Sequence, residues 1–217
     1  MGTWMRFGER AAVLALAVTL LACQGAPQAR TPTRPETADP EMAAAVNREV
    51  AAFRSTNPAD WEEAKRRLLA MGEPAIPYIT AEFRKGDALT ATLCRDVLVT
   101  EGALAVPALL EALGDSHPRA RSAAAVALGR IRDERAVEPL VRVLRGDRAP
   151  VVRAAAARSL GEIGDITASP ALVDGVGDRD EQVRSHCVRS LRQFSGKPYG
   201  TDQDLWRKWW NSAKPKS

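Results

Sequence analysis

The sequence contains few of the residues that build catalytic centres. Its 217 residues include two histidines, three cysteines and two tyrosines. His117 precedes Pro118 and His186 precedes Cys187, so neither histidine is followed by a carboxylate that could share a metal ion. The chain also lacks a Cys/His nucleophile pair, a G-x-S-x-G turn and a glycine-rich phosphate loop. We therefore predict no catalytic residue, no metal site and no cofactor.

The sequence also lacks a strong excess of positive or negative charge. The chain has 31 Lys and Arg residues against 27 Asp and Glu residues, which gives a formal net charge of +4. The main local excess of basic residues comprises Arg130, Arg132, Arg135, Arg142 and Arg145. Nucleic-acid-binding domains carry a much stronger basic patch. The sequence therefore predicts no nucleic-acid partner.

A long apolar run occurs at the amino terminus, where it is still too short to cross a membrane. It covers the eleven residues from Ala11 to Leu21 and comes after Arg6 and Arg10. A helix of this length extends about 16 Å, roughly half the thickness of the hydrocarbon layer. The pattern predicts a signal peptide, residues 1–22.

The apolar run ends in Leu20, Leu21, Ala22 and Cys23. This order resembles the bacterial lipobox, in which the signal is cut before a cysteine that is then acylated. The resemblance implies that Cys23 is the lipidated residue, and two or three acyl chains anchor a protein stably. The alternative is an ordinary signal peptide with an incidental cysteine. Gln24 at the next position implies an outer-membrane lipoprotein that faces the periplasm, with exposure at the cell surface as the alternative.

Residues 23–40 are expected to form a tether after the acylated cysteine. The segment from Gln24 to Pro40 is rich in Pro, Ala and Thr and has no apolar period. Such a composition cannot bury a core, so we expect it to be disordered. A flexible chain of this length reaches about 20–25 Å, which would hold the folded part away from the lipid surface.

Four segments later in the chain repeat one pattern. They are AIPYITAEF from Ala75, AVPALLEAL from Ala105, AVEPLVRVL from Ala136 and ASPALVDGV from Ala168, spaced 30, 31 and 32 residues apart. A period of this length is typical of a solenoid of helix pairs. The sequence therefore predicts an all-α array in which each helix pair is covered by the next.

Apolar residues recur at fixed places in both helices of each unit. In the first helices one aligned position, called the small slot, holds alanine or cysteine, and the position four residues later, called the leucine slot, holds leucine. The small slot comprises Ala64, Cys94, Ala124, Ala156 and Cys187, and the leucine slot Leu68, Leu98, Leu128, Leu160 and Leu191. The second helices share two larger slots four residues apart: Ile79, Leu109, Leu140 and Leu172, then Phe83, Leu113, Leu144 and Val176. These offsets lie on one helix face. We expect the small slot to let neighbouring helices approach closely, with Cys94 and Cys187 buried and unbridged.

The repeats resemble HEAT repeats of the short bacterial type named after the phycobilisome bilin lyases. The resemblance rests on the D-x5-R-x6-L spacing and on the AVPALLEAL and AVEPLVRVL segments, and it covers Ala59 to Phe194. It implies a right-handed α-solenoid of about five helix pairs. We place the HEAT-repeat domain at residues 41–196 and a tryptophan-rich cap and tail at residues 197–217.

Aspartate and arginine recur six residues apart in the later units. The aspartates are expected just before the first helix of each unit, where a carboxylate can accept hydrogen bonds from free backbone amides. The two rows are Asp115, Asp147 and Asp178, and Arg121, Arg153 and Arg184. By resemblance such a ladder is structural in HEAT arrays. The alternative is an arginine row that binds an anionic ligand.

The carboxyl-terminal segment is the least repetitive part of the chain. A Gly/Pro break precedes a predicted helix with Trp206, Trp209 and Trp210 on one face. We expect this helix to cap the last repeat, with Trp206 and Trp210 packed on Leu191 and Phe194. The alternative is an aromatic interface for a membrane, a glycan or a partner.

These observations favour a non-catalytic, membrane-anchored scaffold or adaptor that binds an envelope protein through a concave surface lined by the second helices. The candidate contact residues lie off the apolar stripe: Tyr78, Glu82, Glu111, Arg142, Arg145 and Asp174. The competing hypothesis, which the family name suggests, is a bilin-lyase-like or other cofactor-handling enzyme, including one related to oxidoreductases. A third is an assembly or quality-control factor for envelope proteins.

Overall fold

The computed structural model describes residues 39–213, which form eleven α-helices, five short 3₁₀ turns and no strand. The α-helices are α2 (Pro40–Ala51), α3 (Pro58–Met71), α4 (Ile76–Lys85), α5 (Ala88–Glu101), α6 (Val106–Ala112), α7 (Pro118–Ile131), α8 (Val137–Gly146), α9 (Pro150–Ile163), α10 (Ser169–Gly175), α11 (Glu181–Ser195) and α12 (Gln203–Ala213). The 3₁₀ turns are η1 (Ala52–Arg54), η2 (Glu73–Ala75), η3 (Gly102–Leu104), η4 (Glu134–Ala136) and η5 (Ile166–Ala168).

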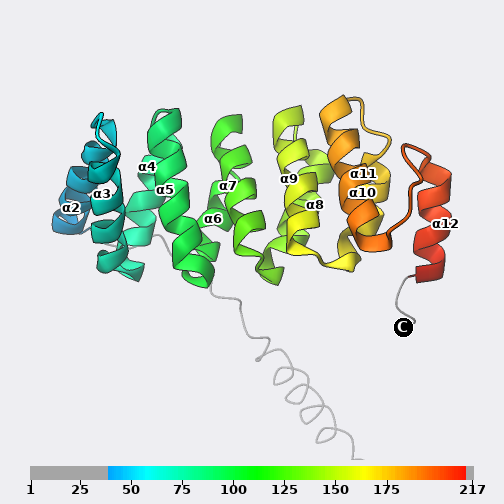
Figure 1. Ribbon diagram of the computed structural model, residues 1–217, viewed down its shortest axis with the longest axis horizontal. Coiled ribbons are helices and arrows are strands. Elements are labelled where there is room, and N and C mark those ends of the chain that lie inside the picture. Colours follow the sequence, from blue (N-terminus) through cyan, green and yellow to red (C-terminus); the bar gives the residue numbers. More distant parts are fainter. Residues whose placement is uncertain (1–38, 214–217) are drawn as a thin grey trace, which may run out of the picture. The chain divides into compact units, whose positions relative to one another are not determined.

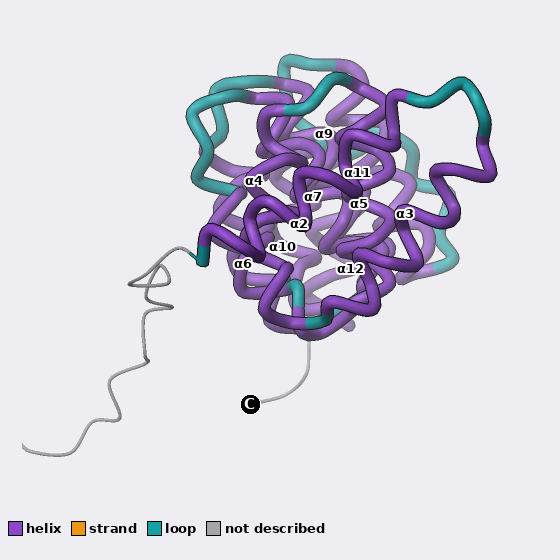
Figure 2. The backbone as a smooth tube through the Cα atoms, turned by 90° about the vertical axis from the view of Figure 1, so that its left-hand side faces the viewer, coloured by secondary structure: helices purple, strands orange, loops and turns teal. Residues whose placement is uncertain are grey.

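The helices form two layers that run in chain order. In Figure 1 the first helices α3, α5, α7, α9 and α11 stand side by side, α4, α6, α8 and α10 lie behind them, and α12 stands at the end of the row. Consecutive first helices pack on each other, most closely α7 on α9 and α9 on α11, while α8 packs on α9 and α10 on α11. Figure 2 looks along this row and shows the helices of successive units superposed. The predicted all-α solenoid of five helix pairs is confirmed.

A helix that the repeat pattern did not reveal precedes the first pair. Helix α2 packs on α3 and α4, and with η1 it buries Val46, Val50 and Phe53 in the core. It begins one residue earlier than the predicted domain, because the Asp39 side chain caps it by accepting from the amide of Glu41 at 2.9 Å. Asp39 and Pro40 therefore belong to this helix and not to the tether. Helix α2 covers the apolar side of the first unit that has no preceding neighbour.

The predicted slots form the core of the array. All five residues of the small slot and all five of the leucine slot are buried, and so are both slots of the second helices. Each unit contributes the same stripe, and the stripes of successive units join into one continuous apolar cluster. Each unit is therefore stabilised by the next, since an isolated hairpin would leave this stripe in water.

Two glycines that the sequence pattern did not single out decide how closely the first helices approach. A Cβ built on Gly129 of α7 would lie 2.6 Å from Cβ of Ser159 in α9, and one on Gly161 of α9 would lie 2.2 Å from Oγ of Ser190 in α11. Ser190 also donates from Oγ to the Ala157 carbonyl at 3.0 Å. The α7–α9 and α9–α11 pairs therefore pack as serine against glycine, and this spacing sets the distance between units.

First helices end in residues with positive φ, which turn the chain toward the second helix. Gly164 ends α9 at φ 88°, and the equivalent position after α7 holds Arg132 at φ 60°. Glycine adopts this conformation without a steric penalty, whereas a side chain with Cβ pays about 1–2 kcal/mol. Arg132 is the one described residue other than glycine with a positive φ. The third unit therefore carries a small local strain at this turn.

We expect Gly161→Ala to destabilise the fold by about 1–3 kcal/mol, because its methyl group would overpack the contact with Ser190. The matched control is Gly146→Ala at the end of α8, where an added Cβ meets no atom within 4 Å. That control should be neutral or slightly stabilising. Urea denaturation would measure both changes, and Ser190→Gly should recover part of the loss in the Gly161→Ala background. Equal stability of the two single variants would show that the α9–α11 spacing is not set by this contact.

Candidate functional site

The aspartate and arginine rows join consecutive repeats through paired hydrogen bonds. Arg121 at the start of α7 donates from Nε and Nη2 to the two carboxylate oxygens of Asp147, at 2.7 and 2.8 Å. Arg153 of α9 holds Asp178 in the same way, with both distances at 2.8 Å. The planar guanidinium matches the two carboxylate oxygens, so each arginine fixes the loop that leads into the next unit.

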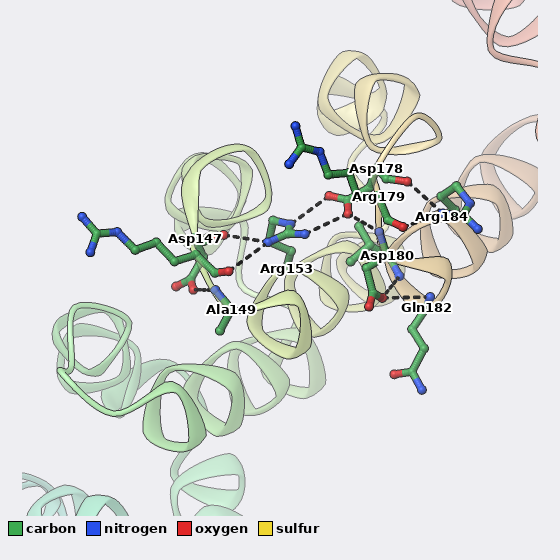
Figure 3. A network of polar contacts seen from close by, with 10 residues as sticks. Asp147, Ala149, Arg153, Asp178, Arg179, Asp180, Gln182 and Arg184 are labelled. Atoms are coloured by element: carbon green, nitrogen blue, oxygen red, sulfur yellow. Dashed lines mark hydrogen bonds and ion pairs between the residues drawn. The ribbon is translucent and has the colours of Figure 1, made fainter.

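The remaining guanidinium nitrogen holds the arginine's own loop. Nη1 of Arg153 donates to the carbonyl oxygens of Asp147 and Arg148, at 2.9 and 3.3 Å. Arg121 makes the equivalent bonds to Asp115 and Ser116. Figure 3 shows Arg153 lying between the Asp147 loop and the Asp178 loop. One side chain therefore ties two consecutive inter-helix loops together.

The ladder aspartates lie just before the first helices and accept from backbone amides, as expected. These amides belong to the N-cap residues His117, Ala149 and Asp180, two residues further on, so the aspartates are not themselves the N-caps. Each carboxylate instead closes a short turn, as in Asp147, whose Oδ1 accepts from the Ala149 amide at 2.8 Å. The ladder also contains a pair that was not predicted: Arg84 at the end of α4 forms an ion pair with the buried Asp115. Arg84 lies on a second helix, outside the repeated arginine slot, so the spacing provided no signal for it.

These bonds lower the pKa of the ladder carboxylates. The hydrogen bond from Arg121 is the largest cause of the lowered pKa of Asp147, and the bond from Arg153 plays this part for Asp178. For Asp115, burial alone would raise the pKa, but the His117 amide and Arg84 outweigh it. A lowered pKa in the folded state adds stability above the unfolded pKa of about 3.9, and that stability is lost as the pH falls through the folded value. At neutral pH the ladder carboxylates are therefore ionised and contribute their full share to the stability of the fold.

The candidate contact residues lie on four second helices and do not meet in one cluster. Their helices are α4 for Tyr78 and Glu82, α6 for Glu111, α8 for Arg142 and Arg145, and α10 for Asp174. Arg145 and Asp174 approach each other, with Nη2 and Oδ2 3.4 Å apart. Tyr78 differs from the other five because it packs against the core and its Oη accepts from the Asp39 amide at 2.6 Å. It holds helix α2 in place and is not a free contact residue.

The tryptophan helix caps the last repeat through a different pair of indoles than the spacing suggested. Trp206 is fully buried, and its Nε1 donates to the Gly200 carbonyl at 2.8 Å. Trp209 packs partly buried against the same core, with its ring centroid 6.0 Å from that of Trp206. Trp210 is outside this cluster and rests against Trp209. The expectation that Trp206 and Trp210 form the buried pair is therefore wrong for Trp210.

Helix α12 packs on α10, so the cap continues the layer of second helices. Gln203 at its first turn donates from Nε2 to the Val173 carbonyl at 2.9 Å. Tyr199, in the segment that leads into the helix, stacks edge-on against Trp206 with centroids 5.0 Å apart. These contacts make α12 the second helix of the fifth unit.

The described thiols are buried in the core. Burial raises the pKa of Cys94 and of Cys187 to about 12, so both remain protonated at neutral pH. Burial also lowers the pKa of His186, and His117 lies exposed in the loop before α7. Within residues 39–213 no group of three or more His, Cys, Asp or Glu side chains converges as a metal site.

The predicted signal peptide, the lipidation site Cys23 and residues 24–38 of the tether lie outside the described residues, as do residues 214–217 of the tail. In the described part of the chain, none of the helices has the length and apolarity needed to cross a membrane.

Comparison with known proteins agrees with the repeat geometry. A family model for HEAT repeats matches residues 101–160 and 138–203. Residues 101–203 therefore belong to the HEAT-repeat family. A solved structure of the CpcE and CpcF complex of phycocyanin lyase from Nostoc is similar at 26% sequence identity and a TM-score of 0.54, covering 66% of this chain and 92% of that one. None of the curated proteins matches the sequence.

Designed armadillo repeat proteins also match the HEAT array, at lower similarity. One, in complex with a (KR)4 peptide, has 14% identity and a TM-score of 0.44, with 79% of this chain and 93% of that chain covered. Another, designed for modular peptide recognition, has 15% identity and a TM-score of 0.40, with 75% and 87% covered.

Substitution of the capping indoles should separate Trp206 from Trp210. We expect Trp206→Ala to cost about 3–5 kcal/mol, because it empties a fully buried site in the core and removes the bond to Gly200. Trp210→Ala, in the same helix, should cost clearly less, because Trp210 is only half-buried. Thermal and urea denaturation of the two variants would test this. Similar losses for both would mean that the last turn of α12 belongs to the core as well.

Proposed function

We propose that this HEAT-repeat protein is a non-catalytic scaffold that binds a partner protein in the bacterial cell envelope. In this proposal lipid chains on Cys23 anchor the protein in the outer membrane facing the periplasm, and the segment after Cys23 links the anchor to the repeats. A solenoid suits this task because its repeated units present one extended surface to a partner. The similar phycocyanin lyase structure is itself a complex of two chains, which supports protein binding by arrays of this type.

The exposed charge on the second helices is the observation that carries the proposal. The side chains of Arg142 and Arg145 on α8 are 66% and 53% exposed. Their acidic neighbours are loosely held, with Glu138 3.7 Å from Arg142 and Asp174 3.4 Å from Arg145. Exposed pairs of this kind contribute about 0–1 kcal/mol, so exchanging them for carboxylates of a partner costs little. The ladder arginines Arg121 and Arg153, in contrast, are committed to their own chain.

The membrane anchor rests on sequence alone. The order Leu20, Leu21, Ala22, Cys23 after a short apolar run supports acylation of the cysteine. The Pro-rich segment after Cys23 is long enough to let the array reach partners above the lipid headgroups. Anchoring would also restrict the search for a partner to the membrane surface, which raises the effective concentration of both proteins.

A bilin-lyase-like activity is the second candidate, because the similar solved structure is a phycocyanin lyase. That activity would require a site for a bilin on the array. Titration of the full chain with a bilin would detect it as a saturable change in the pigment's absorption spectrum. The scaffold proposal expects no such change.

The scaffold proposal is tested by crosslinking in living cells. Full-length protein should crosslink to a defined partner, and the double variant Arg142→Glu, Arg145→Glu should lose most of this product because its charge would repel the partner. Arg119→Glu, Arg148→Glu is the matched control, since both side chains are exposed at or just before the starts of first helices. It should crosslink as the wild type does.

The same experiment includes Cys23→Ser to test the anchor. This variant should leave the membrane fraction and lose the partner product, while its melting temperature stays unchanged. Retention of Cys23→Ser in membranes would contradict the lipid anchor. Equal crosslinking of the two charge-reversal variants would contradict binding through the second helices.

A further inference from the structure

The last arginine of the ladder, Arg184, uses only one of its three guanidinium nitrogens in hydrogen bonds within residues 39–213. Nη1 of Arg184 donates to the carbonyl oxygens of Asp178 and Arg179, both at 2.9 Å, as Arg121 and Arg153 do in their own loops. Within residues 39–213, its Nε and Nη2 have no acceptor, whereas these atoms of Arg153 hold Asp178. Figure 3 shows both arginines: Arg153 spans two loops, and Arg184 is bonded to one.

The sequence indicates why Nε and Nη2 of Arg184 have no acceptor within the described residues. In the preceding units the carboxylate comes from the loop after the second helix of the same unit, as Asp178 comes after α10 for Arg153. For Arg184 the corresponding second helix is α12. Residues 205–217, which include most of α12, contain no Asp or Glu. Residues 205–217 therefore supply no aspartate for Arg184.

Arg184 lines a basic pocket. A hollow of about 420 Å³ lies between α11 and the segment before α12. Its lining residues are Glu181, Arg184, Ser185, Val188, Arg189, Arg192, Gly200 and Thr201. The lining holds three arginines and one glutamate, Glu181, and no ion pair in the described residues joins Arg184 to that glutamate. The pocket favours an anionic group, and the half-buried guanidinium of Arg184 would orient it.

We propose that this terminal pocket binds an aspartate side chain from a segment of the partner protein and so completes the ladder. This role deepens the proposed function, on whose partner protein it rests. An aspartate is favoured because Arg121 and Arg153 both hold an aspartate with the same edge of the guanidinium. Oδ1 of each of these aspartates also accepts a hydrogen bond from the backbone amide two residues further on, which closes a short turn. A partner segment with such a turn would repeat the contacts that the chain already makes twice between its own units.

The proposal can be tested with a peptide that copies one of the chain's own aspartate turns. A fluorescent peptide GDRAPV, the sequence of residues 146–151, carries the aspartate in its native turn. Fluorescence anisotropy would measure its binding to the full chain in detergent, beside the peptide GNRAPV in which asparagine replaces the aspartate. We expect saturable binding of the aspartate peptide and binding about tenfold weaker for the asparagine peptide, because a charge-assisted pair is lost.

Variants locate the binding. Arg184→Lys keeps the charge but cannot make the two-point contact, and it should weaken the aspartate peptide about tenfold. Arg119→Lys, exposed on α7 and outside the pocket, should bind as the wild type does. A readout without any variant is the Nε–H resonance of Arg184 in the wild-type protein, which should shift at lower concentrations of the aspartate peptide than of the asparagine peptide.

Three results would overturn the proposal. Equal affinity for the two peptides, or an unchanged affinity in Arg184→Lys, would show that the carboxylate is not held by this arginine. Competition by inorganic phosphate at concentrations equal to the peptide would mark a general anion pocket instead of an aspartate site. The titration needs neither a membrane nor a cellular partner, so its failure is distinguishable from a failure to capture a partner in cells.

Discussion

The two-point bond between an arginine of one repeat and an aspartate of the next is the interaction on which the later part of the array depends. Apolar stripes alone could slide along each other, because dispersion and hydrophobic contacts have little direction. The Arg121–Asp147 and Arg153–Asp178 pairs fix the relative position of successive loops with distances of 2.7–2.8 Å. The Gly161–Ser190 contact fixes the spacing of the helices that carry them. Direction and distance between units are thus set by different residues.

A linear array also needs its two ends closed, and this chain closes them differently. Helix α2 with η1 covers the first unit through Val46 and Phe53, and helix α12 covers the last through Trp206. Both caps continue the apolar core, but neither continues the polar ladder. The amino-terminal end of the ladder is closed by Arg84 from a second helix, whereas the carboxyl-terminal end stops at Arg184. This asymmetry leaves the array with one end that can accept a carboxylate from another molecule.

Much of this structure could be predicted from the sequence, because repetition converts a weak local pattern into a strong one. The slots of Ala124 and Leu128 recur in each unit, so their burial could be predicted from spacing alone. What does not repeat could not be predicted: helix α2 has no counterpart, and Arg84 lies outside the arginine slot. The choice between Trp209 and Trp210 depends on the angle at which α12 meets α10, which helical periodicity does not encode. The contact surface on the second helices can be placed by periodicity, but no repeated residue specifies its partner.

The most direct test of the ladder is a double-mutant cycle on Arg153 and Asp178, with Arg153→Met and Asp178→Asn measured singly and together in urea. The two side chains are 15% and 14% exposed, so we predict a coupling free energy of about 1.5–3 kcal/mol. The comparison cycle uses Arg158 and Glu162, a more exposed pair one helical turn apart, for which about 0.3–0.5 kcal/mol is expected. Equal coupling in the two cycles would contradict the central role of the ladder, because the repeats would then be held together by their apolar stripes alone.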